Sequence, residues 1–296
     1  MAMYRLTRVM AENSLPSLAE TIRAFDLRAD KSLGQHFLLD PQLLARIAQA
    51  ANLPEGINVI EIGPGPGGLT RALLDTRAGH VTAIEYDKRA VAAVNALAAT
   101  NKRLSIIEAD ALKADLPALV PAPRAIVANL PYNIGTLLLV NWLQQASAFH
   151  SMTLMFQLEV AERICAAPQS PAYGRVSVLT QWLCEVTMLM RIPAGAFAPP
   201  PKVESALIRV VPRSEQPPRA EIKLMERLTA AAFGQRRKML RGALKPLGGA
   251  TLCDEAGIAP ERRAETLSVA EFVRLMRVLQ ARAAGGASDN SSDGLV

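Results

Sequence analysis

The sequence passes from an apolar run into a glycine-rich loop at Val59-Ile60-Glu61-Ile62-Gly63-Pro64-Gly65-Pro66-Gly67-Gly68. The run has the length and β propensity of a buried strand, and the residues that follow, as far as Leu74, continue as a helix. Gly63, Gly65 and Gly68 fit the pattern G-x-G-x-x-G at this junction, where glycine lets the backbone approach a ligand and lets the helix pack on the strand. The two prolines of the loop remove N–H donors, which favours a cofactor without a pyrophosphate.

Two acidic residues stand at the ends of the next two predicted strands. The strand at residues 81–84 ends at Glu85, 22 positions after Gly63, close to the spacing at which a carboxylate holds ribose hydroxyls. The strand at residues 104–107 leads to Asp110, which is placed to accept a hydrogen bond from an adenine amine. Asp87 fits better as the N-cap of the following helix. The glycine loop and the two acids together favour an adenosine-containing ligand.

A fourth apolar strand, at residues 125–128, ends at Asn129-Leu130-Pro131-Tyr132. An amide that can hydrogen-bond and a phenol ring that can stack therefore follow a buried strand. Ligands of open α/β sheets bind outside the carboxyl ends of the strands, so we expect this turn to lie beside the adenosine site. Taken alone, the four residues are equally compatible with an ordinary turn and a partly buried surface tyrosine.

Two further loops carry residues that suit a ligand site. Gly34-Gln35-His36-Phe37 precedes a helix that Asp40 caps and Pro41 begins, so this loop is placed to close over a ligand. A run of three prolines makes the loop from Phe197 to Ser205 stiff and extended, which would hold Phe197 and Lys202 at fixed positions. Each loop could equally be a plain connector.

Composition excludes several classes of protein. The chain has 296 residues, 50% of them hydrophobic, enough for a full core without disulfides. Its apolar runs fall short of the roughly 18 residues that a transmembrane helix needs. The first 13 residues lack the apolar core of a signal peptide, and we expect them to be flexible. Three cysteines and three histidines are scattered without metal-ligand spacing, which predicts reduced thiols and no metal site.

The positive charge is concentrated near the C-terminus. Residues 213–282 contain 14 Lys and Arg against 8 Asp and Glu, an excess that equals the net charge of the whole chain, +6. Such an excess favours a polyanionic partner, although a solvated basic helical face would give the same count. Residues 228–240 are predicted to form one helix; Arg241 follows just after it, four positions from Arg237, so the two arginines would share a helical face.

The pattern of elements predicts two domains of the α/β class. Strands alternate with helices up to residue 213, and residues 214–218 resemble a linker. Residues 214–282 are predicted to be helical, ending in an amphipathic helix at 269–279. Residues 283–296, rich in Gly, Ser and Asp, are expected to be a disordered tail.

Five segments, in this order, resemble the ribosomal RNA adenine dimethylase family, most closely its KsgA-type small-subunit branch. They are Leu33 to Leu38, Glu61 to Gly65, Asn129 to Tyr132, Phe197 to Ser205, and Gln235 to Lys238. The resemblance spans residues 14–282. It implies a Rossmann-like class I methyltransferase domain with a mostly parallel sheet, followed by a small all-α domain that binds RNA.

The resemblance also implies the reaction. Members of this branch use S-adenosylmethionine to dimethylate the N6 amines of two adjacent adenosines in a small-subunit rRNA hairpin. The implied partner is a 30S or pre-30S particle, late in subunit biogenesis. The implied protein is a cytoplasmic monomer that needs neither a membrane nor a metal.

Residue roles follow from the same resemblance. Gln35, His36 and Leu38 would cover the cofactor, Gly63 and Gly65 would approach its methionine part, Glu85 its ribose, Asp110 its adenine and Asn129 the methyl donor. His36 stands where asparagine is common.

Asn129 and the Leu130 carbonyl would accept the hydrogens of the target amine in the turn that Pro131 stiffens. Tyr132 and Phe197 would clamp the extruded base. The expected RNA contacts are Lys202, Arg236, Arg237, Lys238 and Arg241.

Three alternatives stay open. A sister family modifies an adenosine of large-subunit rRNA with similar chemistry, and the choice of RNA substrate would separate the two. A ribosome-assembly factor with secondary or lost activity would support ribosome maturation when Asn129 is replaced. A nicotinamide-dependent oxidoreductase would explain the glycine loop but neither the Asn129 turn nor the basic C-terminal segment.

Overall fold

The computed structural model describes residues 16–27, 36–235 and 237–289. The predicted flexible start, Gln35, Arg236 and the last seven residues of the predicted tail lie outside these ranges. The chain divides into two compact units. Unit 1 contains the described residues up to Trp142, with Ser147–Ala161 and Thr187–Pro212; unit 2 contains Leu143–Ala146, Glu162–Val186 and the described residues from Arg213 onward. The last segment of unit 2 begins at Arg213, next to the predicted boundary. Two earlier segments of the chain also belong to unit 2.

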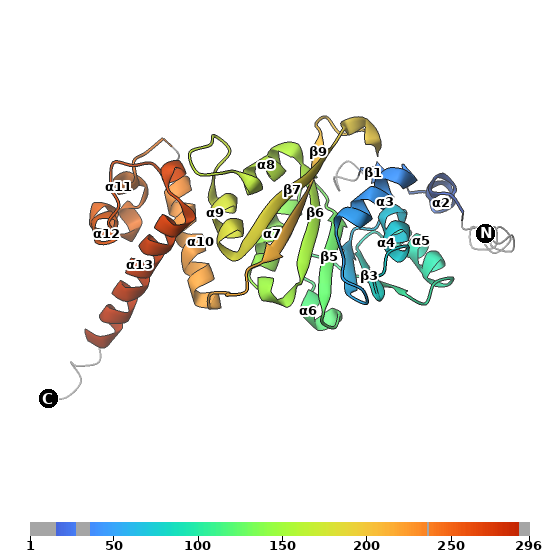
Figure 1. The fold of residues 1–296 in the computed structure, drawn as a ribbon, viewed down its shortest axis with the longest axis horizontal. Coiled ribbons are helices and arrows are strands. Elements are labelled where there is room, and N and C mark those ends of the chain that lie inside the picture. The colour runs from blue at the N-terminus through green and yellow to red at the C-terminus, as the bar shows by residue number, and fades with distance from the viewer. Residues whose placement is uncertain (1–15, 28–35, 236, 290–296) are drawn as a thin grey trace. The chain divides into compact units, whose positions relative to one another are not determined.

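A seven-stranded sheet is the framework of unit 1 (Figure 1). Its strands in spatial order are β4 (Leu104–Glu108), β3 (His80–Glu85), β2 (Asn58–Ile62), β5 (Arg124–Asn129), β6 (Ser151–Gln157), β9 (Ser205–Pro212) and β7 (Cys184–Ile192). The strands from β4 to β6 are parallel to one another, and β9 pairs antiparallel with β6. The predicted α/β class with a mostly parallel sheet is confirmed.

The strand order reverses at β2. The chain runs outward from β2 through β3 to β4 and then returns to β5 on the other side of β2. Glu61 of β2 is in register with Val127 of β5, so the two parallel strands end at the same edge. Open sheets bind ligands at such a switch point, and here the glycine loop follows β2 while Asn129 ends β5.

Helices precede and connect these strands. They are α2 (Leu18–Ala24), α3 (Pro41–Ala50), α4 (Gly68–Leu74), α5 (Lys88–Ala98), α6 (Leu116–Leu119), α7 (Gly135–Leu143) and α8 (Leu158–Cys165). Two predicted caps are confirmed: the Asp40 carboxylate accepts from the Gln42 N–H and that of Asp87 from the Arg89 N–H, each at 2.9 Å. Such caps satisfy N–H groups that a helix leaves unpaired.

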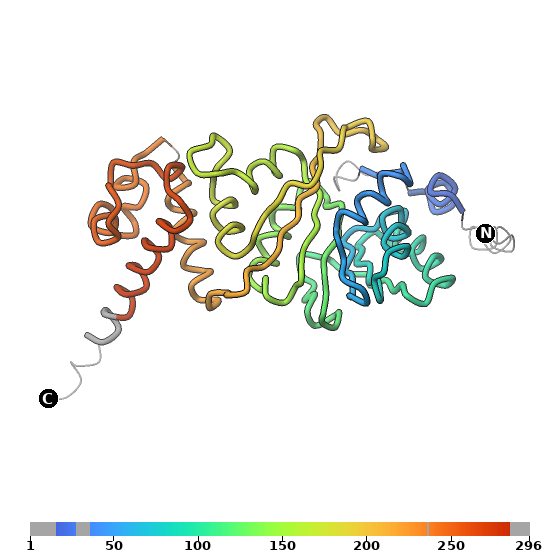
Figure 2. Tube along the Cα trace, viewed as in Figure 1, coloured from blue at the N-terminus to red at the C-terminus, as the bar shows by residue number. Residues whose placement is uncertain are grey.

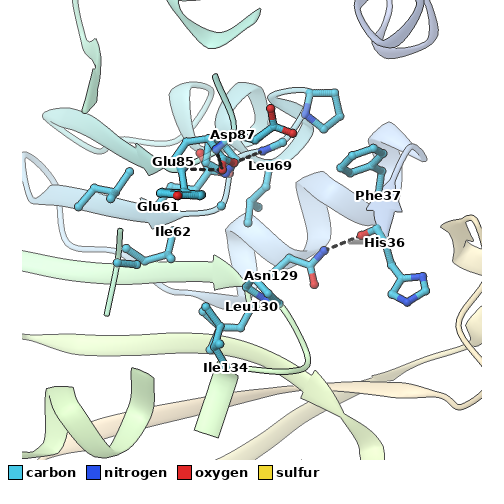
Figure 3. Close-up of a pocket in the computed structure, with 18 of the residues that line it drawn as sticks. His36, Phe37, Glu61, Ile62, Leu69, Glu85, Asp87, Asn129, Leu130 and Ile134 are labelled. Carbon is cyan, nitrogen blue, oxygen red and sulfur yellow. Dashed lines mark hydrogen bonds between the residues drawn. The ribbon is translucent and has the colours of Figure 1, made fainter. Parts of the chain in front are cut away.

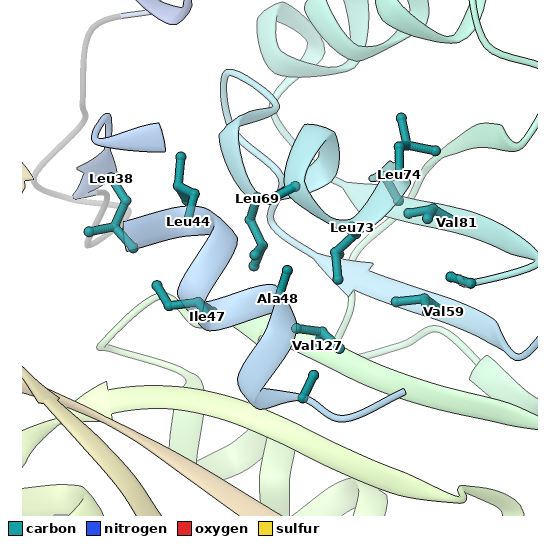
Figure 4. Packing of buried hydrophobic residues seen from close by; sticks show 14 of the residues in the cluster. Leu38, Leu44, Ile47, Ala48, Val59, Leu69, Leu73, Leu74, Val81 and Val127 are labelled. Carbon is teal, nitrogen blue, oxygen red and sulfur yellow. The ribbon is translucent and has the colours of Figure 1, made fainter. Parts of the chain in front are cut away.

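One hydrophobic cluster fixes α3 and α4 against the sheet (Figure 4). Side chains of the two helices pack in one cluster with strand residues whose exposure is close to zero. The members drawn include Leu44, Ile47, Ala48, Leu69, Leu73, Val59, Val81 and Val127. Truncating one of the large members to alanine would cost about 2–5 kcal/mol, so the cluster sets the position of the loop between β2 and α4 firmly.

Two very short strands join loops that are far apart in sequence. β1 (Phe37–Leu38) pairs antiparallel with β8 (Phe197–Ala198), and Leu38 faces Phe197 in this register. Both phenylalanines are buried. The two loops predicted separately therefore form one structure at the edge of the glycine loop.

Unit 2 is mainly helical in its described part, and it also contains the first residues of β7, Cys184–Val186. It contains α9 (Arg175–Leu183), α10 (Arg219–Phe233), α11 (Leu240–Ala243), α12 (Gly249–Glu255) and α13 (Val269–Asp289), of which α10 to α13 appear in orange to red in Figure 2. The Phe233 ring stacks on Phe272 with centroids 5.6 Å apart and meets the Tyr173 ring edge-on at 6.0 Å. These rings tie α10 to α13 and to the segment before α9.

The prediction of one helix over residues 228–240 is wrong. α10 ends at Phe233, and the backbone is extended at Met239 before α11 begins (φ −65°, ψ 156°). The buried Leu240 donates its N–H to the Arg262 carbonyl at 2.7 Å, a long-range bond that local periodicity does not reveal. Arg237 therefore shares no helical face with Arg241. Near the C-terminus, α13 continues to Asp289, so residues 283–289 of the predicted disordered tail are helical.

Candidate active site

A cavity of about 310 Å³ lies at the carboxyl ends of the parallel strands (Figure 3). Ten residues that the sequence proposed for the cofactor or the acceptor line it together. They are His36, Leu38, Gly63, Gly65, Glu85, Asp110, Asn129, Leu130, Pro131 and Tyr132. Segments that are well separated along the chain thus converge on one site.

The glycine loop has a backbone that other residues rarely adopt. Gly63 and Gly65 have φ values of +67° and +53°, in the left-handed region. A Cβ atom on Gly65 would lie 3.0 Å from the Phe37 ring, which also lines the cavity. The backbone conformation therefore favours glycine at Gly65, and a larger residue would force the Phe37 ring to shift.

Glu85 ends β3 with its carboxylate fixed by backbone donors. Oε1 accepts from the N–H groups of Tyr86 and Asp87 at 2.7 and 2.9 Å, and Oε2 accepts a longer bond of 3.4 Å from Gly65. Burial raises the pKa of this carboxyl group, while the three backbone bonds act against the rise. Because Oε2 makes one long bond, it retains the capacity to accept a hydrogen from a ligand hydroxyl.

Asp110 lies at the end of the neighbouring strand and is half-buried. Its Oδ1 accepts from the Leu112 N–H at 3.0 Å, and its Oδ2 lies 3.7 Å from the Lys113 ammonium. Asp110 thus shapes the turn after β4 and also lines the cavity. A role in forming the turn and a role in binding a ligand are compatible here.

Glu61 is a residue of the site that sequence reasoning missed. Its side chain is 1% exposed, and its Oε2 accepts a hydrogen bond of 2.6 Å from the Thr70 hydroxyl of α4. Burial raises the pKa of Glu61 to about 8, and the neighbouring Glu85 contributes to the rise. The signal was present as a single acid inside an apolar strand, since a buried carboxyl group needs a partner.

Asn129 is the last residue of β5 and is oriented by the loop that carries His36. Its Nδ2 donates to the His36 backbone carbonyl at 3.1 Å (Figure 3). The bond uses the donor side of the amide, so Oδ1 remains available as an acceptor. Leu130, which follows, is buried and carries its backbone carbonyl into the same turn.

Tyr132 is held at both ends of its side chain. Its hydroxyl lies 2.6 Å from the hydroxyl of the fully buried Ser205, the first residue of β9. Burial raises the pKa of Tyr132, and the bond with Ser205 acts in the opposite direction. The Tyr132 ring stacks on the His36 ring with centroids 5.2 Å apart and an angle of 29° between the planes. The Ser205 contact was not anticipated from sequence.

Phe197 is placed differently from the other predicted acceptor residues. Its side chain is 4% exposed, packs into the hydrophobic cluster of unit 1 and meets the His36 ring edge-on at 6.4 Å. It is not among the residues that line the cavity. Its role as the second wall of a base clamp stays a prediction.

The four predicted RNA-binding residues that the structure describes lie on the surface. Lys202 is exposed in unit 1, and Arg237, Lys238 and Arg241 are exposed in unit 2. Arg241 lies 3.7 Å from Glu261, which offsets part of its charge. The cavity lining includes none of these four described residues.

The described part of the chain offers neither a metal site nor a membrane span. In it, no group of three or more His, Cys, Asp or Glu side chains is placed to hold a metal ion. No helix within the same ranges has the length and apolar character to cross a bilayer. The three cysteines are unbridged, and burial raises the pKa of Cys165 to about 11 and that of Cys184 to about 12.

Comparisons with known proteins identify the family of the chain. The family model of ribosomal RNA adenine dimethylase matches residues 26–281. Ribosomal RNA small subunit methyltransferase A of Gluconobacter oxydans is 58% identical over 269 residues, covering 90% of this chain and 89% of the relative. The protein of the same name from Paramagnetospirillum magneticum is 54% identical, covering 92% and 98% of the two chains.

Two solved structures share the fold over most of the chain. A dimethyladenosine transferase from Plasmodium falciparum superposes with a TM-score of 0.69 at 25% identity, covering 84% of this chain and 98% of its own. The 23S rRNA methyltransferase ErmE gives a TM-score of 0.63 at 30% identity, covering 82% and 99%. The chain therefore belongs to the ribosomal RNA adenine dimethylase family and is a ribosomal RNA methyltransferase.

Proposed function

We propose that this protein transfers methyl groups from S-adenosylmethionine to the N6 amines of two adjacent adenosines in a small-subunit rRNA hairpin, giving N6,N6-dimethyladenosine. The proposed substrate is rRNA in a 30S or pre-30S particle, late in subunit biogenesis, and the enzyme is proposed to act as a cytoplasmic monomer. The observation that carries the proposal is the convergence of ten predicted cofactor and acceptor residues on one cavity at the strand switch point.

The chemistry of the cavity fits the proposed cofactor. Bare backbone at Gly63 and Gly65 allows close approach of the methionine part. Glu85 offers an acceptor for the ribose hydroxyls, and Asp110 lies one strand further along, where an adenine amine would need an acceptor. When bound, S-adenosylmethionine supplies an electrophilic methyl group. Pro64 and Pro66 interrupt the N–H donors of the glycine loop. A pyrophosphate, which needs several such donors, would therefore fit this loop less well.

The acceptor side of the cavity can activate an adenine amine by orientation. The N6 lone pair of adenine is delocalised into the ring, which makes the amine a poor nucleophile. Asn129 Oδ1 and the Leu130 carbonyl would accept its two hydrogens and direct the lone pair toward the methyl group. Stacking on Tyr132 would hold the extruded base, a contact worth roughly 1–3 kcal/mol.

A strong general base is not part of the proposed mechanism. Burial raises the pKa of the Glu61 carboxyl group to about 8, and the proposal assigns that group no proton transfer. Orientation of the two reactants can itself lower a barrier by about 7–11 kcal/mol. The residues that would supply it are those that fix Asn129 and Tyr132.

Methyl transfer in vitro tests the proposal. Purified protein and labelled S-adenosylmethionine are incubated with unmethylated 30S subunits or with naked large-subunit rRNA, and the RNA is digested and analysed by mass spectrometry. We expect N6,N6-dimethyladenosine from the 30S subunits. Methylation of the large-subunit RNA instead would indicate the specificity of the sister family, and 30S binding without transfer would indicate an assembly factor.

A further inference from the structure

His36 contacts three side chains that the sequence predicts to hold the target base. Its backbone carbonyl accepts the hydrogen bond from Asn129, its ring stacks on Tyr132, and its ring edge meets Phe197. The imidazole resembles a nucleobase in being a flat heterocycle with polar ring atoms. His36 thus engages all three of these side chains.

The His36 ring leaves no space for a base on the face of Tyr132 that it covers. The ring centroids are 5.2 Å apart, whereas inserting a third ring needs about 7 Å, twice a stacking distance of roughly 3.5 Å. The ring is also anchored: Nδ1 lies 2.8 Å from the Pro199 carbonyl oxygen, so Nδ1 carries the hydrogen and donates it. A base that stacks on this face must displace an anchored ring.

We propose that the His36 imidazole occupies the place on Tyr132 that the target adenine takes during methylation. This inference rests on the proposed function. Entry of the adenine then exchanges one stacked ring for another and breaks the bond between His36 and Pro199. His36 lowers the occupancy of the site by any base, so a base that the bound RNA presents weakly leaves the site to the ring.

The structure allows the ring to be tested apart from the backbone. Asn129 is bonded to the carbonyl of His36, not to its side chain, so His36→Ala retains the contact that orients the acceptor amide. His36→Phe keeps a ring that can stack on Tyr132 but lacks the donor for Pro199. His150 is exposed and directly precedes β6, so it lies at the amino ends of the parallel strands, whereas the cavity lies at their carboxyl ends. His150→Ala is therefore a matched control.

The test uses the small-subunit rRNA hairpin with 2-aminopurine at the target adenosine, in the presence of S-adenosylhomocysteine. Fluorescence of the 2-aminopurine reports extrusion of the base, and thermal unfolding checks that each variant is folded. We expect His36→Ala to raise the equilibrium constant for base occupancy about two- to tenfold, the range for one aromatic pair. His36→Phe should lie closer to wild type, and His150→Ala should equal it.

An unchanged or reduced base occupancy in folded His36→Ala would overturn the inference; a reduction would make the ring a supporting wall of the base site. The result of this test can be distinguished from the result of the test of the proposed function. Methyl transfer to 30S subunits by the wild-type protein decides the function, whereas the ratio between His36→Ala and wild type decides the role of the ring.

Discussion

The side-chain amide of Asn129 donates a hydrogen bond of 3.1 Å to the backbone carbonyl of His36. This bond fixes which end of the amide faces the acceptor site, because the nitrogen is engaged and the oxygen is left free. It also joins the end of β5 to the loop that leads into β1. The geometry of the acceptor site thus depends on a contact between residues 93 positions apart.

Asn129→Asp should reduce turnover on 30S subunits by about 100-fold, the scale expected when a reacting group is misplaced by about 1 Å. A carboxylate cannot donate to the His36 carbonyl and would be repelled by it. The measurement is kcat with saturating S-adenosylmethionine. Asn141→Asp, an identical change at an exposed position of α7, is the control. Equal rates for Asn129→Asp and wild type would rule out this role of the amide.

Tyr132→Phe and Ser205→Ala should each reduce turnover about two- to tenfold, because both remove the same neutral hydrogen bond. The double variant should be no worse than the more affected single variant. Tyr132→Ala should be more damaging than Tyr132→Phe, since it removes the ring, and should change S-adenosylmethionine affinity far less than turnover. Full additivity of the two single effects would show that the hydroxyls act separately.

Glu85→Gln should weaken binding of S-adenosylhomocysteine by about tenfold or more, measured by calorimetry. The substitution replaces a carboxylate oxygen, which accepts backbone hydrogens, by an amide group that cannot. Glu108 offers a matched control, because it faces Glu85 in the register of β3 and β4 but is exposed and does not line the cavity. A similar loss of affinity in Glu108→Gln would show that the effect comes from removing any nearby negative charge, not from the hydrogen bonds of Glu85.

Glu61→Gln should stabilise the cofactor-free protein increasingly as pH rises from about 4.5 to about 8. Burial raises the pKa of Glu61 from 4.5 to about 8, so in this window the unfolded chain releases a proton that the folded chain retains, and folding loses stability. Glutamine cannot ionise and escapes this loss, which reaches about 4–5 kcal/mol at most. Urea unfolding at a series of pH values measures the difference; a pH-independent difference would contradict it. Exposed Glu55→Gln is the control.

Replacing Arg237 and Lys238 by glutamine should weaken binding to 30S subunits and flatten its salt dependence. The logarithmic slope should fall by about 0.7–0.9 for each RNA phosphate that the variant no longer neutralises. Arg241→Gln should have a smaller effect, because Glu261 lies 3.7 Å away. Binding titrations at several salt concentrations provide the slopes. An unaltered slope in the double variant would mean that this cluster is only a solvated face.

Local patterns sufficed to predict four neighbouring strands of the sheet and the residues at their ends. The apolar strands, the glycine loop and the caps Asp40 and Asp87 depend on residues that are adjacent along the chain. Local sequence patterns therefore predict them. Because parallel strands end at one edge, residues at successive strand ends such as Glu85 and Asn129 could be grouped before their distances were known.

What the sequence did not reveal depends on contacts between distant segments. Strands of two residues, such as β1 and β8, have no period, and only their pairing explains the burial of Phe197. The break between α10 and α11 follows from the burial and long-range bonding of Leu240. The bond from Tyr132 to Ser205 likewise spans 73 positions.

The proposed reaction is tested most directly by mass spectrometry of small-subunit rRNA from cells that contain the protein, lack it, or carry Asn129→Asp. We predict N6,N6-dimethyladenosine at two adjacent positions in the first cells and its absence, or strong depletion, in the other two. Persistence of both dimethylated adenosines in cells without the protein, or loss of a modification from large-subunit rRNA instead, would contradict it.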